Sequence, residues 1–158
     1  MGFFSPENIV GDTCLAIPNA SLYHFGVLQS AMHMAWVKNV CGRLKSDFRY
    51  SNEIVYNNFP WQKDITLNQK KAIEKAAQKV LDAREKYPES SLAILYTPTK
   101  TPPDLVKAHL ELDKAVDLAY RPQPFASEAN RMEFLFNLYE TYTADLFTKE
   151  KTRRKKMA

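Results

Sequence analysis

The apolar segment between Ser21 and Leu44 constrains the fold more than any other feature of the sequence. Its apolar residues recur at helical spacing and cover almost the whole circumference of the expected helix: Leu22, Phe25, Leu28, Met32, Ala35, Trp36 and Val40, widened by Val27, Met34 and Val37. A helix that is apolar on nearly every side must be buried. We therefore expect one long buried helix from about residue 21 to about residue 44, with Gly42 as its terminating residue.

Short strands are expected on both sides of this helix. Residues 1–20 contain Pro6, Gly11 and Pro18, which favour loops, and "ENIVGD" and "TCLAIP" can each form a brief strand. After the helix, "EIVY" is rich in β-branched and aromatic residues, and Pro60 closes the segment. The first part of the chain is thus predicted to be α+β.

The chain after Trp61 has the pattern of amphipathic helices. Thr66 and Gln69 form a capping box before the first of them, and the pair Pro102–Pro103 starts the second. Ser127 caps a third, which is expected to end near Leu146. We predict a mainly α chain with an α+β portion in residues 1–62 and an all-α segment of three main helices in residues 63–148. A basic, disordered tail is expected in residues 149–158.

The net charge of +4 comes from the end of the chain. The segment "KEKTRRKK", residues 149–156, holds six cations and one acid, and the rest of the sequence has 16 cations against 17 acids. This tail is either a solvated terminus or an arm that contacts phosphates, and composition does not decide between the two.

Several classes of function are disfavoured. No apolar run free of charge reaches membrane-spanning length, and the start lacks the features of a secretory signal. Cys14 and Cys41 do not have metal-ligand spacing, and His24 and His33 lie nine residues apart, on opposite sides of a helix. No glycine-rich phosphate loop or other catalytic motif is present. We expect a cytoplasmic chain without catalytic activity or a bound cofactor of its own.

The segment "GRLKSDFRYS" is the most informative candidate for function. Its charged residues Arg43, Lys45, Asp47 and Arg49 stand at alternate positions, so in one extended strand all four would project from the same face. Lysine and arginine donate to the O6 and N7 atoms of guanine, and aspartate accepts from the N4 amine of cytosine. Such a row could read base pairs in duplex DNA. The alternative is an exposed strand face with a weak Lys45–Asp47 surface pair.

The sequence also resembles a known family over nearly its whole length. The run from "IPNASLYHFGVL" to "VYNNFPW" is similar to the C-terminal part of the single-chain type IIG/IIL restriction-modification enzymes, which are adenine-specific, S-adenosylmethionine-dependent DNA methyltransferases. The similarity continues through "AAQKVLDAREKYPESSLAILY", "PPDLVKAHLELDKAVDLAYR" and "RMEFLFNLYETY". It implies that the chain closes a target-recognition domain, with a helical C-terminal segment after it.

The resemblance implies roles for individual residues. The positions of Lys45 and Asp47 select a base pair, and that of Arg49 contributes to reading a nearby one. Arg43, Tyr23, His24 and Asn57 are candidates for backbone or base contacts, although packing or turn formation explains the last three equally well; Trp36 and Trp61 are expected in the core or at a domain junction.

The resemblance also implies partners outside this sequence. The partners are double-stranded DNA and the upstream methyltransferase and recognition segments, in the same or a companion chain of a bacterium or archaeon. S-adenosylmethionine would bind an upstream domain. The alternative function is a helical protein-protein interaction module with a basic tail.

Overall fold

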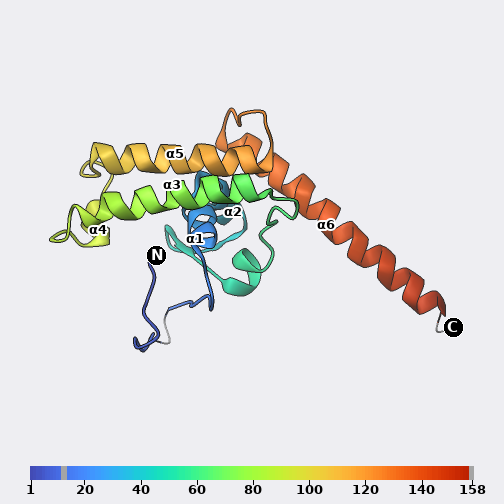
Figure 1. Ribbon diagram of the computed structural model, residues 1–158. Coiled ribbons are helices and arrows are strands. Elements are labelled where there is room, and N and C mark those ends of the chain that lie inside the picture. Colours follow the sequence, from blue (N-terminus) through green and yellow to red (C-terminus); the bar gives the residue numbers. More distant parts are fainter. Residues whose placement is uncertain (12–13, 157–158) are drawn as a thin grey trace. The chain divides into compact units, whose positions relative to one another are not determined.

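The computed structural model describes residues 1–11 and 14–156, and its side chains up to residue 144. The chain is mainly α-helical with one small two-stranded sheet (Figure 1). It forms two compact units, Met1–Met34 with Lys63–Pro124, and Ala35–Gln62 with Phe125–Ala158. Neither unit is a continuous stretch of chain.

The core of the first unit lies between three helices. Helix α3 (Leu67–Glu85) and helix α5 (Pro103–Tyr120) lie side by side, and α1 (Leu22–Gln29) packs against them (Figure 1). Gly26 allows the close approach of α1, because a Cβ atom there would stand 2.7 Å from Cγ2 of Ile73. The largest residues of this core have almost no exposed surface: Val27, Met32, Ile73, Val80, Leu105, Leu112 and Val116.

The predicted long helix is interrupted. Helix α1 ends at Gln29, and α2 (Ala31–Val40) begins two residues later. Ser30 between them has an extended backbone with ψ of 160°, and its hydroxyl donates to the carbonyl of Val27 at 2.7 Å. A carboxylate oxygen of Asp113 in α5 accepts from the amide of Ala31 at 2.7 Å. This carboxylate supplies a cap for α2 from a distant part of the chain, so the periodicity of the segment itself could not reveal the break.

The predicted strands in the first twenty residues do not form. Within residues 1–11 and 14–20, the structure shows turns and irregular backbone only. Ser5 accepts from the amide of Glu7, and Asn19 has a positive φ of 57°. Turn chemistry and the absence of a pairing strand outweigh the β propensity of the few apolar residues there.

The predicted start signals of the later helices are confirmed. The hydroxyl of Thr66 accepts from the amide of Gln69, and the Gln69 side chain returns to the amide of Thr66 at 2.9 Å. Helix α5 begins at Pro103, as the proline pair indicated, and the short helix α4 (Leu92–Leu95) lies between α3 and α5. These starts depend on local chemistry, which explains why the sequence identifies them.

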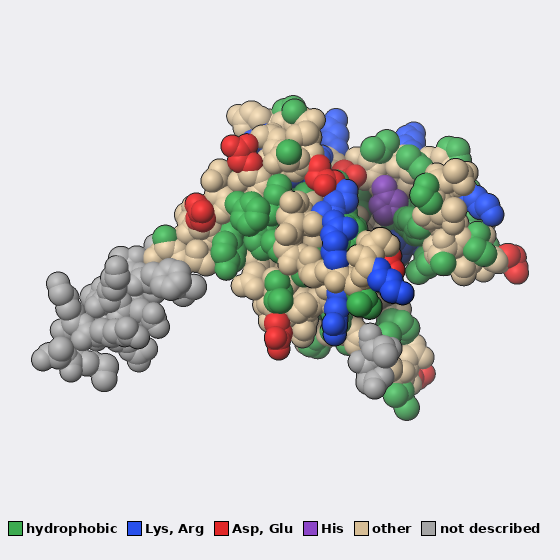
Figure 2. Space-filling view, turned by 180° about the vertical axis from the view of Figure 1, so that it is seen from behind, with side chains coloured by type: hydrophobic (Ala, Val, Ile, Leu, Met, Phe, Trp, Pro, Cys, Tyr) green, Lys and Arg blue, Asp and Glu red, His purple; other side chains and the backbone are tan. Residues whose placement is uncertain are grey.

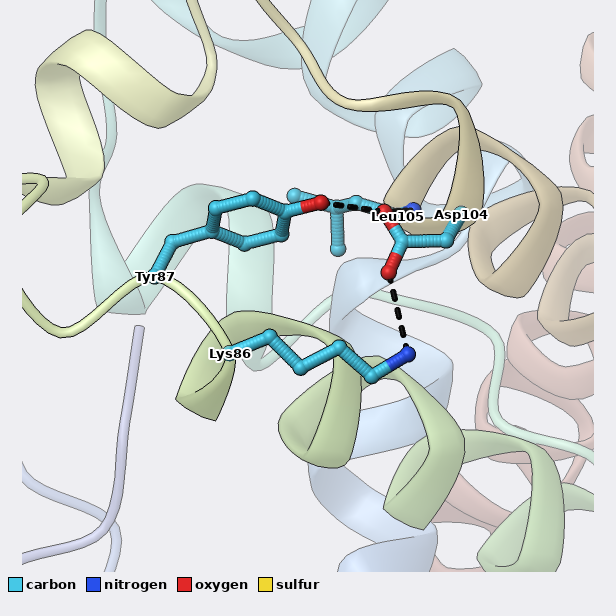
Figure 3. Close-up of polar contacts among 4 residues, drawn as sticks. All are labelled: Lys86, Tyr87, Asp104 and Leu105. Carbon is cyan, nitrogen blue, oxygen red and sulfur yellow. Dashed lines mark hydrogen bonds and ion pairs between the residues drawn. The ribbon is translucent and has the colours of Figure 1, made fainter.

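A polar cluster joins the end of α3 to the start of α5 (Figure 3). One carboxylate oxygen of Asp104 accepts from Tyr87 at 2.9 Å, and the other pairs with Lys86 at 3.1 Å. These hydrogen bonds, first from Lys86 and then from Tyr87, lower the pKa of the Asp104 carboxyl. At the opposite ends of the two helices, Gln69 donates to the carbonyl of Leu118. The two contacts together show that α3 and α5 are antiparallel.

Arg84 connects several elements of the first unit. Its guanidinium donates to the Tyr96 hydroxyl at 2.7 Å and to the Gln29 side chain at 2.8 Å, and it lies over the ring of Phe25. The Tyr96 hydroxyl also meets Nε2 of His109 at 2.7 Å. Residues of α1, α3, α5 and the α4 segment are therefore tied together at one point.

The second unit is built around Trp36. This side chain is 2% exposed, its Nε1 donates to the carbonyl of Val55 at 3.1 Å, and its ring packs against Phe59, Phe136 and Tyr139. The expectation that Trp36 belongs to the core is confirmed.

The predicted strand around Ile54 is wrong. Residues Asn52–Tyr56 form a π-helical turn, η1, closed by a hydrogen bond of 2.8 Å from the amide of Asn57 to the carbonyl of Asn52. Ser51 accepts from the amide of Ile54, and the Asn58 side chain donates to two carbonyls of the turn. Polar side chains on both sides thus satisfy the backbone locally, which outweighs the β propensity of the apolar residues.

Helix α6 (Glu128–Lys156) is longer than predicted. Ser127 accepts from the amide of Asn130 at 3.1 Å and so caps it, as expected. The helix continues past residue 146 because the following lysine, arginine and glutamate residues favour helix and no glycine or proline interrupts them. The backbone of residues 149–156 is helical, whereas their side chains and residues 157–158 lie outside the described part. The disorder expected of this tail stays a prediction.

Candidate nucleic-acid interface

The residues Arg43, Lys45, Asp47 and Arg49 lie together on an exposed β-hairpin of the second unit. Strand β1 (Gly42–Leu44) pairs antiparallel with β2 (Asp47–Arg49), and residues 45 and 46 form the connection. Every residue from 42 to 49 is exposed. The prediction of one continuous extended strand is wrong, because the chain reverses direction at the middle of the charged segment.

The hairpin register changes which charged side chains share a face. Arg43 stands opposite Phe48, whereas the flanking pairs are Gly42 with Arg49 and Leu44 with Asp47. Directly opposed residues project from the same face, and neighbouring pairs project from opposite faces. Asp47 and Arg49 therefore share one face, and Arg43 lies on the other. The predicted row of four charges on one face is wrong.

Lys45 occupies the tip of the hairpin. It is the first of two loop residues and has a positive φ of 57°, a feature of the tight turns that connect hairpin strands. This conformation is uncommon for a lysine and disfavoured by its Cβ atom. Among the described residues, no ion pair joins Lys45 to Asp47. The surface pair of the alternative interpretation is thus not formed.

The two arginines of the hairpin have different surroundings. The guanidinium of Arg43 lies over the ring of Phe48, 4.4 Å from its centroid, which is cation–π geometry. Arg49 stands opposite Gly42, and a Cβ atom added to that glycine would meet nothing within 4 Å. Arg43 is therefore held by an aromatic ring, while Arg49 has open space across the strand pair. Phe48 was not among the residues predicted from the sequence, and its only signal was its place in the alternating segment.

Tyr50 marks the point where the hairpin joins the body of the second unit. Its side chain is half-buried, and burial, with smaller contributions from Tyr56 and Cys41, raises the pKa of its hydroxyl to about 12. Tyr50 is consequently neutral throughout the physiological range. The half-buried base contrasts with the eight exposed residues beyond it.

The three remaining candidate residues have structural roles. His24 lies in α1, and its Nδ1 accepts from the amide of Ser21 at 3.1 Å in a capping box. Tyr23 lies beside it, with the ammonium of Lys70 5.8 Å from the centre of its ring. Both belong to the first unit, and the hairpin belongs to the second. Asn57 is exposed at the C-terminal end of η1. The contacts of these three residues with DNA stay a prediction.

The described residues show few other candidate sites. Among them, no group of three or more His, Cys, Asp or Glu side chains could hold a metal ion. No described helix is long and apolar enough to cross a membrane. On the face of the molecule shown in Figure 2, exposed hydrophobic side chains stand among the Lys and Arg side chains. Such a mixed surface can offer both charge and apolar contact.

Two family models cover almost the whole chain. The model of the MmeI target recognition domain matches residues 1–63, and that of the MmeI C-terminal domain matches residues 65–147. The two matches meet where the amphipathic helices begin.

One bacterial protein and one solved structure agree with these matches. DNA methyltransferase A of Bacillus subtilis (strain 168) is 41% identical over 143 residues, which are 90% of this chain and 16% of that protein. The structure of the type IIL restriction-modification enzyme MmeI in complex with DNA is 48% identical, covers 81% of this chain and 17% of that one, and has a TM-score of 0.77. The human nebulin-related-anchoring protein is 31% identical over 102 residues, 64% of this chain and 6% of that protein.

The chain spans about one sixth of the length of the first two relatives. The family assignment depends on the two domain matches and on these relatives, which cover four fifths or more of this chain. The chain belongs to the MmeI family and carries a target-recognition segment followed by the family's C-terminal domain.

Proposed function

We propose that this chain recognises a sequence in duplex DNA as part of a restriction-modification enzyme, with the hairpin of residues 42–49 as its reading element. The match of residues 1–63 to a target recognition domain carries the proposal. The exposure of every residue of the hairpin supports it, because base-reading side chains must be accessible to the groove.

The hairpin suits the major groove of DNA. That groove is about 12 Å wide and accepts a two-stranded β-ribbon, and the hairpin is such a ribbon with Lys45 at its tip. The Lys45 ammonium can donate to O6 or N7 of guanine. Asp47, the first residue after the loop, can accept from N4 of the paired cytosine. Together they address both bases of one G·C pair.

Arg49 is proposed to read a neighbouring position. It shares a face with Asp47, and no side chain stands across from it, so its guanidinium can extend toward a base edge. Tyr23, His24 and Asn57 remain candidates for backbone contacts. Such contacts add affinity without sequence information.

The helical part is proposed to support the reading element. Its helices pack through their buried faces, and exposed lysines on α3, such as Lys71 and Lys75, are available to phosphates. The basic residues 149–156 are proposed as an arm that contacts the DNA backbone. The alternative of a solvated terminus predicts no effect of their removal on DNA affinity.

Catalysis is assigned to other parts of the parent protein. We propose that the parent is an adenine-specific DNA methyltransferase, that S-adenosylmethionine binds upstream of this chain, and that other recognition segments read the rest of the target. The proposed location is the cytoplasm of a bacterium or archaeon. The name of the Bacillus subtilis relative, a DNA methyltransferase, supports the assignment of methyltransferase activity to the parent protein.

Selection from a random duplex DNA library tests the proposal. The wild-type chain should enrich a short motif with a G·C pair, and Lys45→Ala should lose the preference at that pair, at a cost of roughly 1–3 kcal/mol. Deletion of residues 149–156 should weaken binding to all sequences alike and flatten the salt dependence. Enrichment of no motif, even with the upstream recognition segment added, would favour the alternative of a protein-interaction module.

A further inference from the structure

We infer that Phe48 positions Arg43 for a contact with the DNA phosphate backbone, on the face of the hairpin opposite the base-reading residues. The inference rests on the proposed function and assigns separate tasks to the two faces. Asp47 and Arg49 share one face, and Arg43 and Phe48 share the other. When the tip of a ribbon enters a groove, each face of the ribbon lies toward one wall. A side chain that is held back from the tip meets the phosphates along that wall, whereas a side chain that extends toward the tip can reach the base edges.

The stacking limits how far Arg43 can reach. Its guanidinium lies 4.4 Å from the ring centre of the residue directly across the strand pair, so it stays at the level of its own cross-strand pair. That pair is two residues from the tip, or about 6–7 Å back along the strand. The major groove is about 8.5 Å deep. With Lys45 near the groove floor, Arg43 is therefore close to the rim, where the phosphates are.

Stacking also leaves the hydrogen-bonding groups of Arg43 available. The cation–π contact does not use the N–H groups of the guanidinium as donors to an acceptor oxygen, so these groups can bind phosphate oxygens bidentately. Among the described residues, no ion pair involves Arg43. The charge is thus held in place without being neutralised.

The contact with Arg43 gives a reason for an exposed phenylalanine at position 48. The ring is 39% exposed on a hairpin with no buried face. Arginine loses more side-chain entropy than most residues when it is fixed, and fixing it before binding removes that cost from the association. Phe48 is consequently a positioning residue, and Arg43 is the residue that contacts DNA.

A double-mutant cycle on the full chain tests the inference. Affinity for one duplex that carries the selected motif is measured over a range of salt concentrations for Arg43→Ala, Phe48→Leu and the double variant. Arg43→Ala should weaken binding about ten-fold at moderate salt and reduce the salt slope by about 0.9. Phe48→Leu should weaken binding about two- to five-fold. The same change should have almost no effect when Arg43 is already alanine.

Two further variants separate positioning from general damage to the hairpin. Phe48→Tyr keeps the ring and should restore wild-type affinity. Arg49→Ala should change the preferred base at one position, whereas Arg43→Ala should lower affinity equally for all sequences. Additive losses in the cycle, or a changed base preference in Arg43→Ala, would overturn the inference while leaving the proposed function intact. Failure of the wild-type chain to bind any duplex, even with the upstream recognition segment added, would overturn both.

Discussion

The antiparallel pair α3 and α5 and the exposed hairpin β1–β2 use their residues in opposite ways. The helices place one face in a core where Leu105, Leu112 and Val116 have no exposed surface, so each of these side chains contributes to stability. The hairpin exposes all residues from 42 to 49, and its backbone is fixed by one turn and three cross-strand pairs. We propose that the helical core sets the stability of this chain, whereas the hairpin sets which DNA sequence it recognises.

Truncation of a buried leucine should give the largest effect. Leu112→Ala removes a side chain with 0% exposure from the core of the first unit and should lower the free energy of unfolding by about 2–5 kcal/mol. Leu110 on the same helix is 64% exposed, and Leu110→Ala is the matched control, with an expected change within about 0.5 kcal/mol. Urea denaturation measures both, and equal losses would contradict the assignment of the core.

Acid should weaken the helical core through one histidine. His33 is 2% exposed, and burial lowers its pKa from 6.5 to about 4. In the unfolded chain the pKa returns to its ordinary value, so the unfolded state binds a proton that the folded state does not. Stability should therefore fall as the pH drops below 6.5, by about 2 kcal/mol at pH 5 and about 3 kcal/mol at pH 4.

Urea denaturation at pH 7 and pH 5 measures this dependence. The variant His33→Leu is the control, because it should lose most of the difference between the two pH values whatever its absolute stability. His109, whose pKa burial also lowers, leaves a smaller residual dependence. A variant with the same pH dependence as the wild type would show that His33 does not titrate as proposed.

Loss of the cap on α2 should have an intermediate effect. Asp113→Ala removes the acceptor for the amide of Ala31 and should destabilise the chain by about 1 kcal/mol. Asp113→Asn keeps an acceptor oxygen and should recover part of that loss. Thermal unfolding of the wild type and the two variants at equal pH measures these differences in stability. An alanine variant as stable as the wild type would mean that water accepts the hydrogen bond of the Ala31 amide equally well.

A change at the tip of the hairpin should have the smallest effect on folding. Lys45→Asn removes the charge but tolerates the positive φ at this position, so the free energy of unfolding should change by less than about 0.5 kcal/mol. The same variant should lose the preference for one base pair. A large loss of stability would show that the hairpin is part of the folding core, and would contradict the division of roles between the helices and the hairpin.

Local signals made the helical segment predictable from the sequence. Thr66 with Gln69, the proline pair before Asp104, and Ser127 each mark a helix start within a few residues, and all three starts agree with the structure. Leu105, Leu112 and Val116 of α5 are buried, in agreement with the amphipathic pattern of the chain after Trp61. Such features depend on neighbours in the chain, which a sequence contains.

The features that were not predicted depend on other parts of the chain, or on polar side chains that form hydrogen bonds with the nearby backbone. The break at Ser30 is stabilised by Asp113, which lies 82 residues beyond Ala31. The π-helical turn at Ile54 depends on Ser51 and Asn58, which satisfy its backbone. The alternation of charges correctly predicted extended backbone in residues 42–44 and 47–49, but "KS" is a weak turn signal, so the reversal at Lys45 was not recognised. The resemblance, rather than the spacing, was what pointed to the recognition of DNA.

An exchange of the two proposed base readers tests the central claim most directly. The double variant Lys45→Asp with Asp47→Lys keeps the composition and net charge and places an acceptor where the donor was. Selection from a random duplex library should show a preference for C·G where the wild type prefers G·C, with the rest of the motif unchanged. An unchanged preference at that pair, or an equal loss of affinity for every sequence, would contradict the account.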